Sequence, residues 1–175
     1  MDRRDSLPKP QRSTAGFAEV VQQHWTAVYK LAYTLSGKLH DSEDLTQETF
    51  LRALDKLETF QPDTNMRAWL LRIASNAFFD LQRRRQRVNQ QPLPDDVAGT
   101  SRPVGQTLET AEQGELLKAA LTELTELTRM VFHLRAQEDL SFKEIAEIVG
   151  TSEEAARWHM HQARSKLLKR MAPKE

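Results

Sequence analysis

Apolar residues recur at helical spacing along the first part of the chain. The spacing predicts a helix over residues 17–35, which Gly37 closes. A second helix is predicted to begin at Asp41 or Ser42 and to reach about residue 57. The apolar face of the first helix comprises Phe17, Val20, Val21, His24, Val28, Leu31, Ala32 and Leu35.

Thr64 or Asn65 is predicted to cap a third helix, which reaches about residue 87. Residues 67–85 within it are apolar nearly all round, so we expect this helix to be buried on more than one side. Its strongly basic end suits a phosphate backbone and equally suits a helix C-terminus. The polar residues that need partners wherever they are buried are Arg72, Asn76 and Asp80.

Residues 88–106 contain turn-forming residues and no apolar periodicity, which indicates a flexible or extended linker. Residues 1–14 are basic and carry no apolar segment, so they are expected to form a flexible tail and not a targeting peptide. Helical spacing resumes near Thr107. The pattern therefore predicts an all-α chain in which two small helical domains, 15–87 and 107–175, are joined by a flexible linker.

The segment from Leu140 to Ala155 has the layout of two short helices joined by a tight turn. Ser141 with Glu144 fits a capping box, and Gly150 stands where a helix usually stops. A second capping box is predicted between Thr151 and Glu154. This spacing is typical of a helix-turn-helix, whose second helix can enter a DNA major groove, although an ordinary helical hairpin has the same spacing.

The second helix of this motif has a buried stripe at Ala156, Met160, Ala163 and Leu167. The opposite side carries Trp158, which is costly to leave in water and therefore indicates a partner surface, unless the ring folds back on its own helix. Arg157 and Gln162 flank it and have the chemistry to contact bases. The other polar residues on this side and at the basic end are Ser152, Glu154, His161, Arg164, Ser165, Lys166, Lys169, Arg170 and Lys174.

The predicted second helix presents an acidic stripe with leucines at its edges. Such a stripe can dock a basic protein surface but suits nucleic acid poorly; a merely solvated face fits the pattern equally well. Its members are Asp41, Asp44, Leu45, Gln47, Glu48, Leu51 and Asp55.

Composition narrows these possibilities further. The 175 residues include 25 basic and 25 acidic ones, so the formal net charge is zero and a second protein is expected to help the chain hold DNA. The absence of cysteine excludes disulfides and thiolate metal sites, and no apolar run reaches the length of a membrane span. No phosphate loop, nucleophile elbow or zinc motif is present. We therefore predict neither an enzyme nor a bound metal or cofactor.

Two motifs in the same order resemble those of bacterial sigma factors. Residues 41–53 (DSEDLTQETFLRA) resemble the polymerase-docking motif, and residues 67–76 (RAWLLRIASN), with Asp80 and the arginine run, resemble the adjoining promoter-melting helix. The C-terminal motif is similar to the module that recognises the −35 element. The resemblance covers roughly residues 17–168 and points to the small extracytoplasmic-function (ECF) group of the sigma-70 family, with a region 2-like bundle of three or four helices and a region 4-like helix-turn-helix domain.

The resemblance implies a cytoplasmic, DNA-binding transcription initiation factor. Its partners would be the RNA polymerase core, through the clamp helices of the largest subunit and the flap, promoter DNA and a stress-responsive anti-sigma factor. The acidic stripe would dock the polymerase. The residues implied to bind the −10 element are Phe60, Asp63, Thr64, Asn65, Arg67, Arg72, Asn76, Arg83, Arg84 and Arg85. Those implied to bind the −35 element are Ser152, Glu154, Arg157, Trp158, His161, Gln162, Arg164 and Lys166.

The sequence departs from the family at several positions. Thr125 stands where proline is common, Trp158 replaces a small hydroxyl residue, and His159 and Gln162 stand where arginine is frequent. The −35 surface is therefore bulkier and less basic than usual. Two alternatives remain open: a stand-alone helix-turn-helix regulator, and a sigma-like interaction protein that does not recognise promoters.

Overall fold

The computed structural model describes residues 14–61, 64–88 and 108–171, and every regular element in these ranges is helical, as predicted. The predicted linker and most of the predicted N-terminal tail lie outside the described residues. The elements are α1 (Thr14–Ser36), α2 (Leu39–Asp55), the 3₁₀ turn η1 (Leu57–Thr59), α3 (Met66–Val88), α4 (Leu108–Thr122), α5 (Glu126–Ala136), α6 (Phe142–Val149) and α7 (Glu153–Met171).

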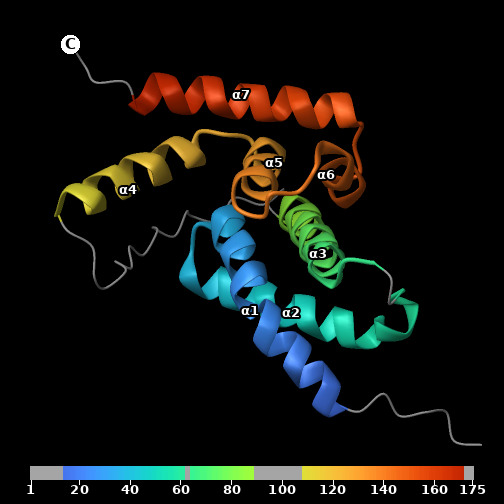
Figure 1. The fold of residues 1–175 in the computed structure, drawn as a ribbon. Coiled ribbons are helices and arrows are strands. Elements are labelled where there is room, and N and C mark those ends of the chain that lie inside the picture. The colour runs from blue at the N-terminus through green and yellow to red at the C-terminus, as the bar shows by residue number, and fades with distance from the viewer. Residues whose placement is uncertain (1–13, 62–63, 89–107, 172–175) are drawn as a thin grey trace, which may run out of the picture.

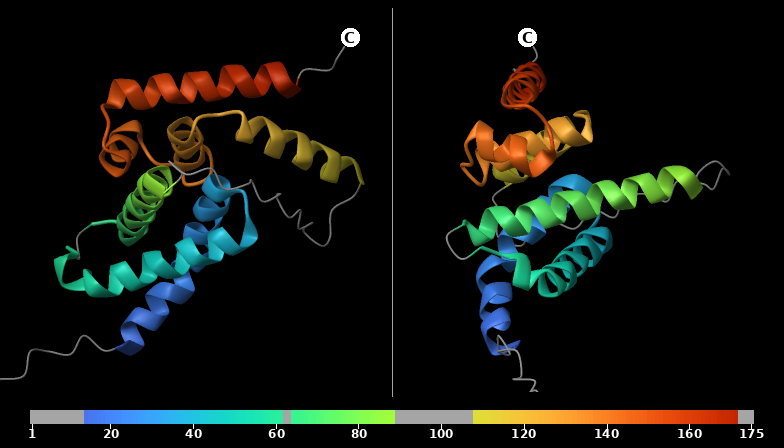
Figure 2. Two further views of the ribbon diagram at one scale, coloured as in Figure 1. Left: turned by 180° about the vertical axis from the view of Figure 1, so that it is seen from behind. Right: turned by 90° about the vertical axis from the view of Figure 1, so that its right-hand side faces the viewer.

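The helices form two groups, which we call the N-terminal half (α1–α3) and the C-terminal half (α4–α7). Figures 1 and 2 show the two halves stacked on each other, with α7 on the outer side of α5 and α6. The halves touch where α1 packs against α5 and where α3 packs against α6. Among the described residues, no helix is long and apolar enough to cross a membrane.

The core of the N-terminal half is built by the apolar faces of its three helices. Leu31 of α1 and Leu70 and Leu71 of α3 are completely buried. The ring of Phe50 in α2 stacks on Trp25 with centroids 5.7 Å apart. The buried hydroxyls of Thr46 and Thr49 each donate to the backbone carbonyl four residues earlier, so α2 packs closely without leaving these groups unsatisfied.

Helix α3 confirms the expectation of burial on more than one side. It packs against α1 and α2 within its own half and against α6 of the other half. Ile73, Ala74, Ala77 and Phe78 are all buried, and successive residues on a helix point in directions about 100° apart. Together with Leu70, Leu71 and Ser75, which are also buried, these positions span about 200° of the helix circumference, more than one neighbouring helix covers.

Several helix ends follow the predicted local chemistry. Gly37 and Gly150 adopt left-handed φ angles of 67° and 72° after α1 and α6. The side-chain oxygen of Asn65 accepts from the backbone N–H groups of Arg67 and Ala68 at the start of α3. Ser141 and Glu144 form the predicted reciprocal capping box at the start of α6.

Two predicted helix starts are wrong. Helix α2 begins at Leu39, before the predicted Asp41 or Ser42, and its N-cap residue Lys38 makes no side-chain cap. Helix α7 is capped by Ser152, whose hydroxyl accepts from the N–H of Ala155 at 3.1 Å, and not by Thr151. Neighbouring hydroxyl residues offer the same cap chemistry, so tertiary packing selects between them.

We expect alanine to have opposite effects at two glycines. An added Cβ meets no atom within 4 Å at either Gly16 or Gly150, so packing does not distinguish the sites. Gly150→Ala places a side chain in left-handed backbone and should lower the free energy of unfolding by about 1–2 kcal/mol. Gly16→Ala, inside α1, should raise it by up to about 1 kcal/mol. Urea unfolding followed by circular dichroism measures both, and equal effects would contradict the role of the Gly150 turn.

Candidate functional site

Helix α2 turns a polar surface with one prominent leucine away from the core. Leu51 is 61% exposed, which is unusual for a large apolar side chain in a helix that also buries Phe50. Leu54, on the same helix, is also exposed and extends this apolar area. We call the predicted docking residues that the structure exposes the acidic face; they are Asp44, Gln47, Glu48, Leu51 and Asp55.

Two predicted docking residues do not belong to the acidic face as the sequence suggested. The prediction that Leu45 lies at its edge is wrong, because Leu45 is only 4% exposed and belongs to the core that α2 forms with α1 and α3. Asp41 is half-buried, and its carboxylate lies 3.2 Å from the guanidinium of Arg85 at the far end of α3. Both residues therefore support the packing of α2 beneath the acidic face.

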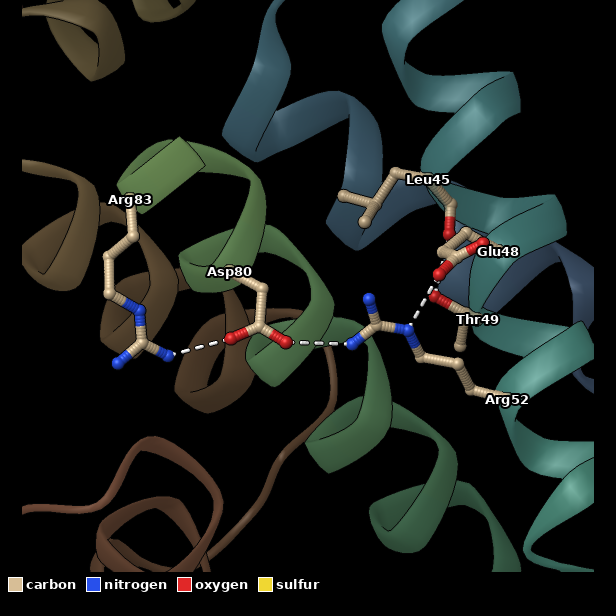
Figure 3. Close-up of polar contacts among 6 residues, drawn as sticks. All are labelled: Leu45, Glu48, Thr49, Arg52, Asp80 and Arg83. Carbon is tan, nitrogen blue, oxygen red and sulfur yellow. Dashed lines mark hydrogen bonds and ion pairs between the residues drawn. The ribbon is translucent and has the colours of Figure 1, made fainter. Parts of the chain in front are cut away.

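A row of alternating charges fixes the acidic face to α3. Arg52 donates to Glu48 at 2.7 Å and to Asp80 at 2.8 Å, and Arg83 donates to the second oxygen of Asp80 at 2.7 Å (Figure 3). Asp80 is one of the polar residues of the third helix that were expected from the sequence to need partners, and Arg52 and Arg83 are those partners. The hydrogen bond from Arg52 holds the pKa of Asp80 below its ordinary value, and the bond to Asp80 raises the pKa of Arg52.

The segment before α3 forms one wall of a cleft. Phe60 packs on Trp69 with ring centroids 5.2 Å apart, and the Thr64 hydroxyl donates to the carbonyl of Gln61 at 2.7 Å. Asp63, predicted beside them, lies outside the described residues. The cleft measures about 410 Å³, and its lining is Thr59, Gln61, Thr64, Asn65, Ala68, Trp69 and Arg72 from the N-terminal half and Glu144, Glu147 and Ile148 from α6.

The cations predicted to meet DNA along α3 are only partly available. Arg72, Asn76 and Arg84 are exposed. Arg83 is engaged by Asp80, and Arg85 by Asp41. Of these predicted −10 contacts along α3, Arg72, Asn76 and Arg84 are therefore available to a ligand, whereas Arg83 and Arg85 first have to share or leave a carboxylate.

Helix α7 has the two-sided character that its sequence predicted. The stripe at Ala156, Met160, Ala163 and Leu167 is buried, and Trp158 is 57% exposed on the opposite side, where its ring meets the ring of His159 edge to face with centroids 4.9 Å apart. Of the other predicted residues on the outer side, Gln162 and Ser165 are half-buried, and the exposed ones are Ser152, Glu154, Arg157, His161, Arg164 and Lys166.

Two neighbours of Trp158 are held by other helices. The Arg157 guanidinium lies 4.8 Å from the ring centroid of Phe142 in α6 and pairs with Glu153. The Nδ1 atom of His159 lies 2.9 Å from the hydroxyl of Thr128 in α5, and burial lowers the pKa of this histidine. His159 therefore packs inward, and Trp158 and Leu168 are the large apolar side chains that α7 exposes away from its buried stripe.

In the part of the chain that the structure describes, no three acidic or histidine side chains are grouped so that they could hold a metal ion.

The functional contacts that sequence reasoning missed are Phe142 beneath Arg157 and Thr128 beneath His159. Both join helices that are separated in sequence, so no local spacing indicates them.

Comparison with known proteins matches both halves of the chain. A family model described as Sigma-70 region 2 matches residues 20–88, and one described as Sigma-70, region 4 matches residues 114–167. The chain is 38% identical over 160 residues to the ECF RNA polymerase sigma factor SigE of Mycolicibacterium smegmatis, covering 90% of this chain and 62% of that relative.

Two further similarities extend over most of both proteins. The RNA polymerase sigma factor NccH of Alcaligenes xylosoxydans xylosoxydans is 31% identical, covering 86% of this chain and 84% of NccH. The structure resembles that of the sigma factor RpoE from Bartonella quintana, solved in complex with the anti-sigma factor NepR, with a TM-score of 0.77 and 25% identity over 93% of this chain and all of that chain.

We expect the charge row of Figure 3 to make stability depend on acid. The pKa of folded Asp80 lies below the ordinary value of about 3.9, so its ionised form contributes stability at neutral pH that is lost as the pH falls below about 4. Asp80→Asn should therefore be less stable than the parent at pH 7, and the difference should shrink as the pH falls from about 5 to about 2.

Denaturant unfolding at several pH values tests this expectation. The matched control is Asp55→Asn, which removes an exposed carboxylate from the end of α2 and should change the free energy of unfolding by less than about 0.5 kcal/mol throughout. A difference between Asp80→Asn and the parent that stays constant over this pH range would contradict the role of the charge row.

Proposed function

Because the chain belongs to the sigma-70 family of RNA polymerase sigma factors, in its ECF group, we propose that it binds the bacterial polymerase core and directs it to specific promoters. The observation that carries this proposal is that regions 2 and 4 match, in order, the two helical halves of one chain. Members of the family initiate transcription and are not enzymes. The chain acts by binding: residues 15–87 serve the polymerase and the −10 element, and residues 107–175 serve the −35 element.

The acidic face is the proposed dock for the clamp helices of the largest polymerase subunit. Asp44 and Glu48 supply negative charge, and the exposed Leu51 supplies apolar area that a partner can bury. The hydrogen bond from Arg52 orients Glu48, which reduces the side-chain entropy lost on binding. Docking supplies affinity that a chain of zero net charge lacks for DNA alone.

The cleft before α3 is the proposed site for an unstacked −10 base. Trp69, on which Phe60 packs, offers aromatic surface for stacking, and Asn65 and Thr64 offer groups for hydrogen bonding to a base edge. Arg72 and Asn76 are exposed further along α3, on the path that the backbone of the melted strand would follow. Trapping an extruded base favours strand opening without covalent chemistry.

The outer side of α7 is the proposed −35 contact, with the flap of the polymerase as a neighbour of the C-terminal half. Trp158 would bury its ring against bases, and Arg164 and Lys166 would contact phosphates. We also propose control by an anti-sigma protein, supported by the similar RpoE structure with NepR, and action in the cytoplasm, where polymerase meets the chromosome.

Run-off transcription tests the proposal directly. The purified chain is added to bacterial core polymerase on genomic DNA fragments, and the 5′ ends of the transcripts are sequenced. A shared upstream sequence at chain-dependent start sites is expected. Tight specific binding to duplex DNA without polymerase, and no chain-dependent starts, would instead identify a stand-alone regulator.

Charge reversal should abolish docking. Asp44→Lys with Glu48→Lys should weaken binding to core polymerase by at least about a hundredfold, because two favourable charge contacts become repulsive. Glu19→Lys with Glu43→Lys makes the same charge change at exposed positions of α1 and α2 outside the acidic face, and should bind within about threefold of the parent. Fluorescence anisotropy of the labelled chain measures both, and equal losses would refute the assignment.

Removing the exposed indole should weaken −35 recognition while leaving the fold intact. Trp158→Ala should lower transcription from −35-dependent promoters by about 5- to 100-fold, because it removes an exposed ring that is proposed to bury itself against the bases. His159→Asn alters a residue that packs against Thr128, so it should lower thermal stability more than promoter choice. An unchanged promoter profile in Trp158→Ala would show that this ring serves another partner.

A further inference from the structure

One carboxylate of the C-terminal half is buried against the N-terminal half. The side chain of Glu138, in the turn between α5 and α6, is only 1% exposed. It pairs with the guanidinium of Arg67 at the start of α3, and its other oxygen lies 3.7 Å from Nε2 of His133 in α5. A buried carboxylate needs such partners, and here the cation comes from the other half of the molecule.

Further polar contacts surround this pair. The Thr34 hydroxyl of α1 lies 2.9 Å from Nδ1 of His133, and burial together with the charge of Arg67 lowers the pKa of His24 in α1. Burial raises the pKa of Glu138, but the neighbouring His133 and Arg67 outweigh it and leave the pKa below its ordinary value. Glu138 is therefore ionised at neutral pH in the packed arrangement, as an ion pair with Arg67 requires.

The same packing places acid opposite the proposed −10 site. Glu144 and Glu147 of α6 line the cleft across from Asn65 and Arg72. Negative charge on that wall opposes the entry of a phosphate backbone. A promoter strand that follows α3 would therefore meet both an occupied Arg67 and an acidic opposite wall.

We propose that Glu138 is an intramolecular competitor of promoter DNA: it holds Arg67 and the two halves together until a phosphate of the melted strand replaces it. The proposal rests on the proposed function, since it takes Arg67 to be a −10 contact. A carboxylate and a phosphate offer a guanidinium the same charged, bidentate partner. When DNA binds only the arrangement in which the halves are separated, its apparent affinity is the intrinsic affinity multiplied by the fraction of molecules in that arrangement.

The test uses the full chain with one dye on each half. The chain has no cysteine, so Gln22→Cys in α1 and Lys169→Cys in α7 give two exposed labelling sites for energy transfer. Glu138→Gln should raise the separated fraction and the affinity for a short single-stranded DNA of mixed sequence by about fivefold or more. The matched control is the next residue: Asp139 is 95% exposed, and Asp139→Asn should change neither value.

A second variant keeps the test decisive if Glu138→Gln does not fold. Thr34→Val removes the α1 hydroxyl beside His133 and should raise the separated fraction to a smaller extent. Folded variants that keep the parental energy transfer would overturn the proposal, as would an equal gain in DNA affinity for Asp139→Asn. Failure of the sigma-factor function gives a different result: the halves separate in Glu138→Gln, yet core polymerase starts no transcripts with the parent chain.

Discussion

The burial of α3 on two sides is the constraint on which the rest of the structure depends. The buried positions of α3, from Ile73 through Leu70 and Leu71 to Ser75, span about 200° of its circumference, so one neighbouring helix cannot cover them all. The N-terminal half covers one side through α1 and α2, and α6 covers part of the other. The residues before and along α3 therefore stand at the junction of both halves, and any ligand that follows α3 competes with packing between them.

Paired charges are the second consequence of this arrangement. A chain with equal numbers of acidic and basic residues cannot attract DNA by net charge, and the structure engages much of its basic surface internally. Asp80 engages Arg83, Asp41 engages Arg85, and Glu138 engages Arg67. Each pair lowers the affinity of the free chain for phosphate. A partner protein that orients the chain on DNA would offset this loss of phosphate affinity. Such an arrangement is expected of a factor that binds DNA only as part of a larger assembly.

Local chemistry made much of this fold predictable. The capping box at Ser141 and the left-handed Gly150 depend on residues within one helical turn, and the stripe ending at Leu167 depends on helical periodicity alone. Spacing alone does not predict which leucine borders the acidic face, because Leu45 lies three residues before Glu48 and Leu51 lies three residues after it. Only the packing of α1 and α3 on α2 decides that Leu45 is buried. The contact of Glu138 with Arg67 joins distant segments, and no spacing in the sequence indicates it.

Packing within the C-terminal half determines which side chains of the proposed −35 surface on α7 are available to a ligand. Phe142 and Glu153 hold the guanidinium of Arg157, so this cation is oriented but partly satisfied before DNA arrives. His159 is turned inward to Thr128. The outer side of α7 therefore presents the aromatic surface of Trp158 and the exposed Arg164 and Lys166, while Arg157 is already engaged. Aromatic contact adds discrimination by shape and little salt-dependent affinity, so under the proposed function the acidic face of α2 supplies much of the attachment.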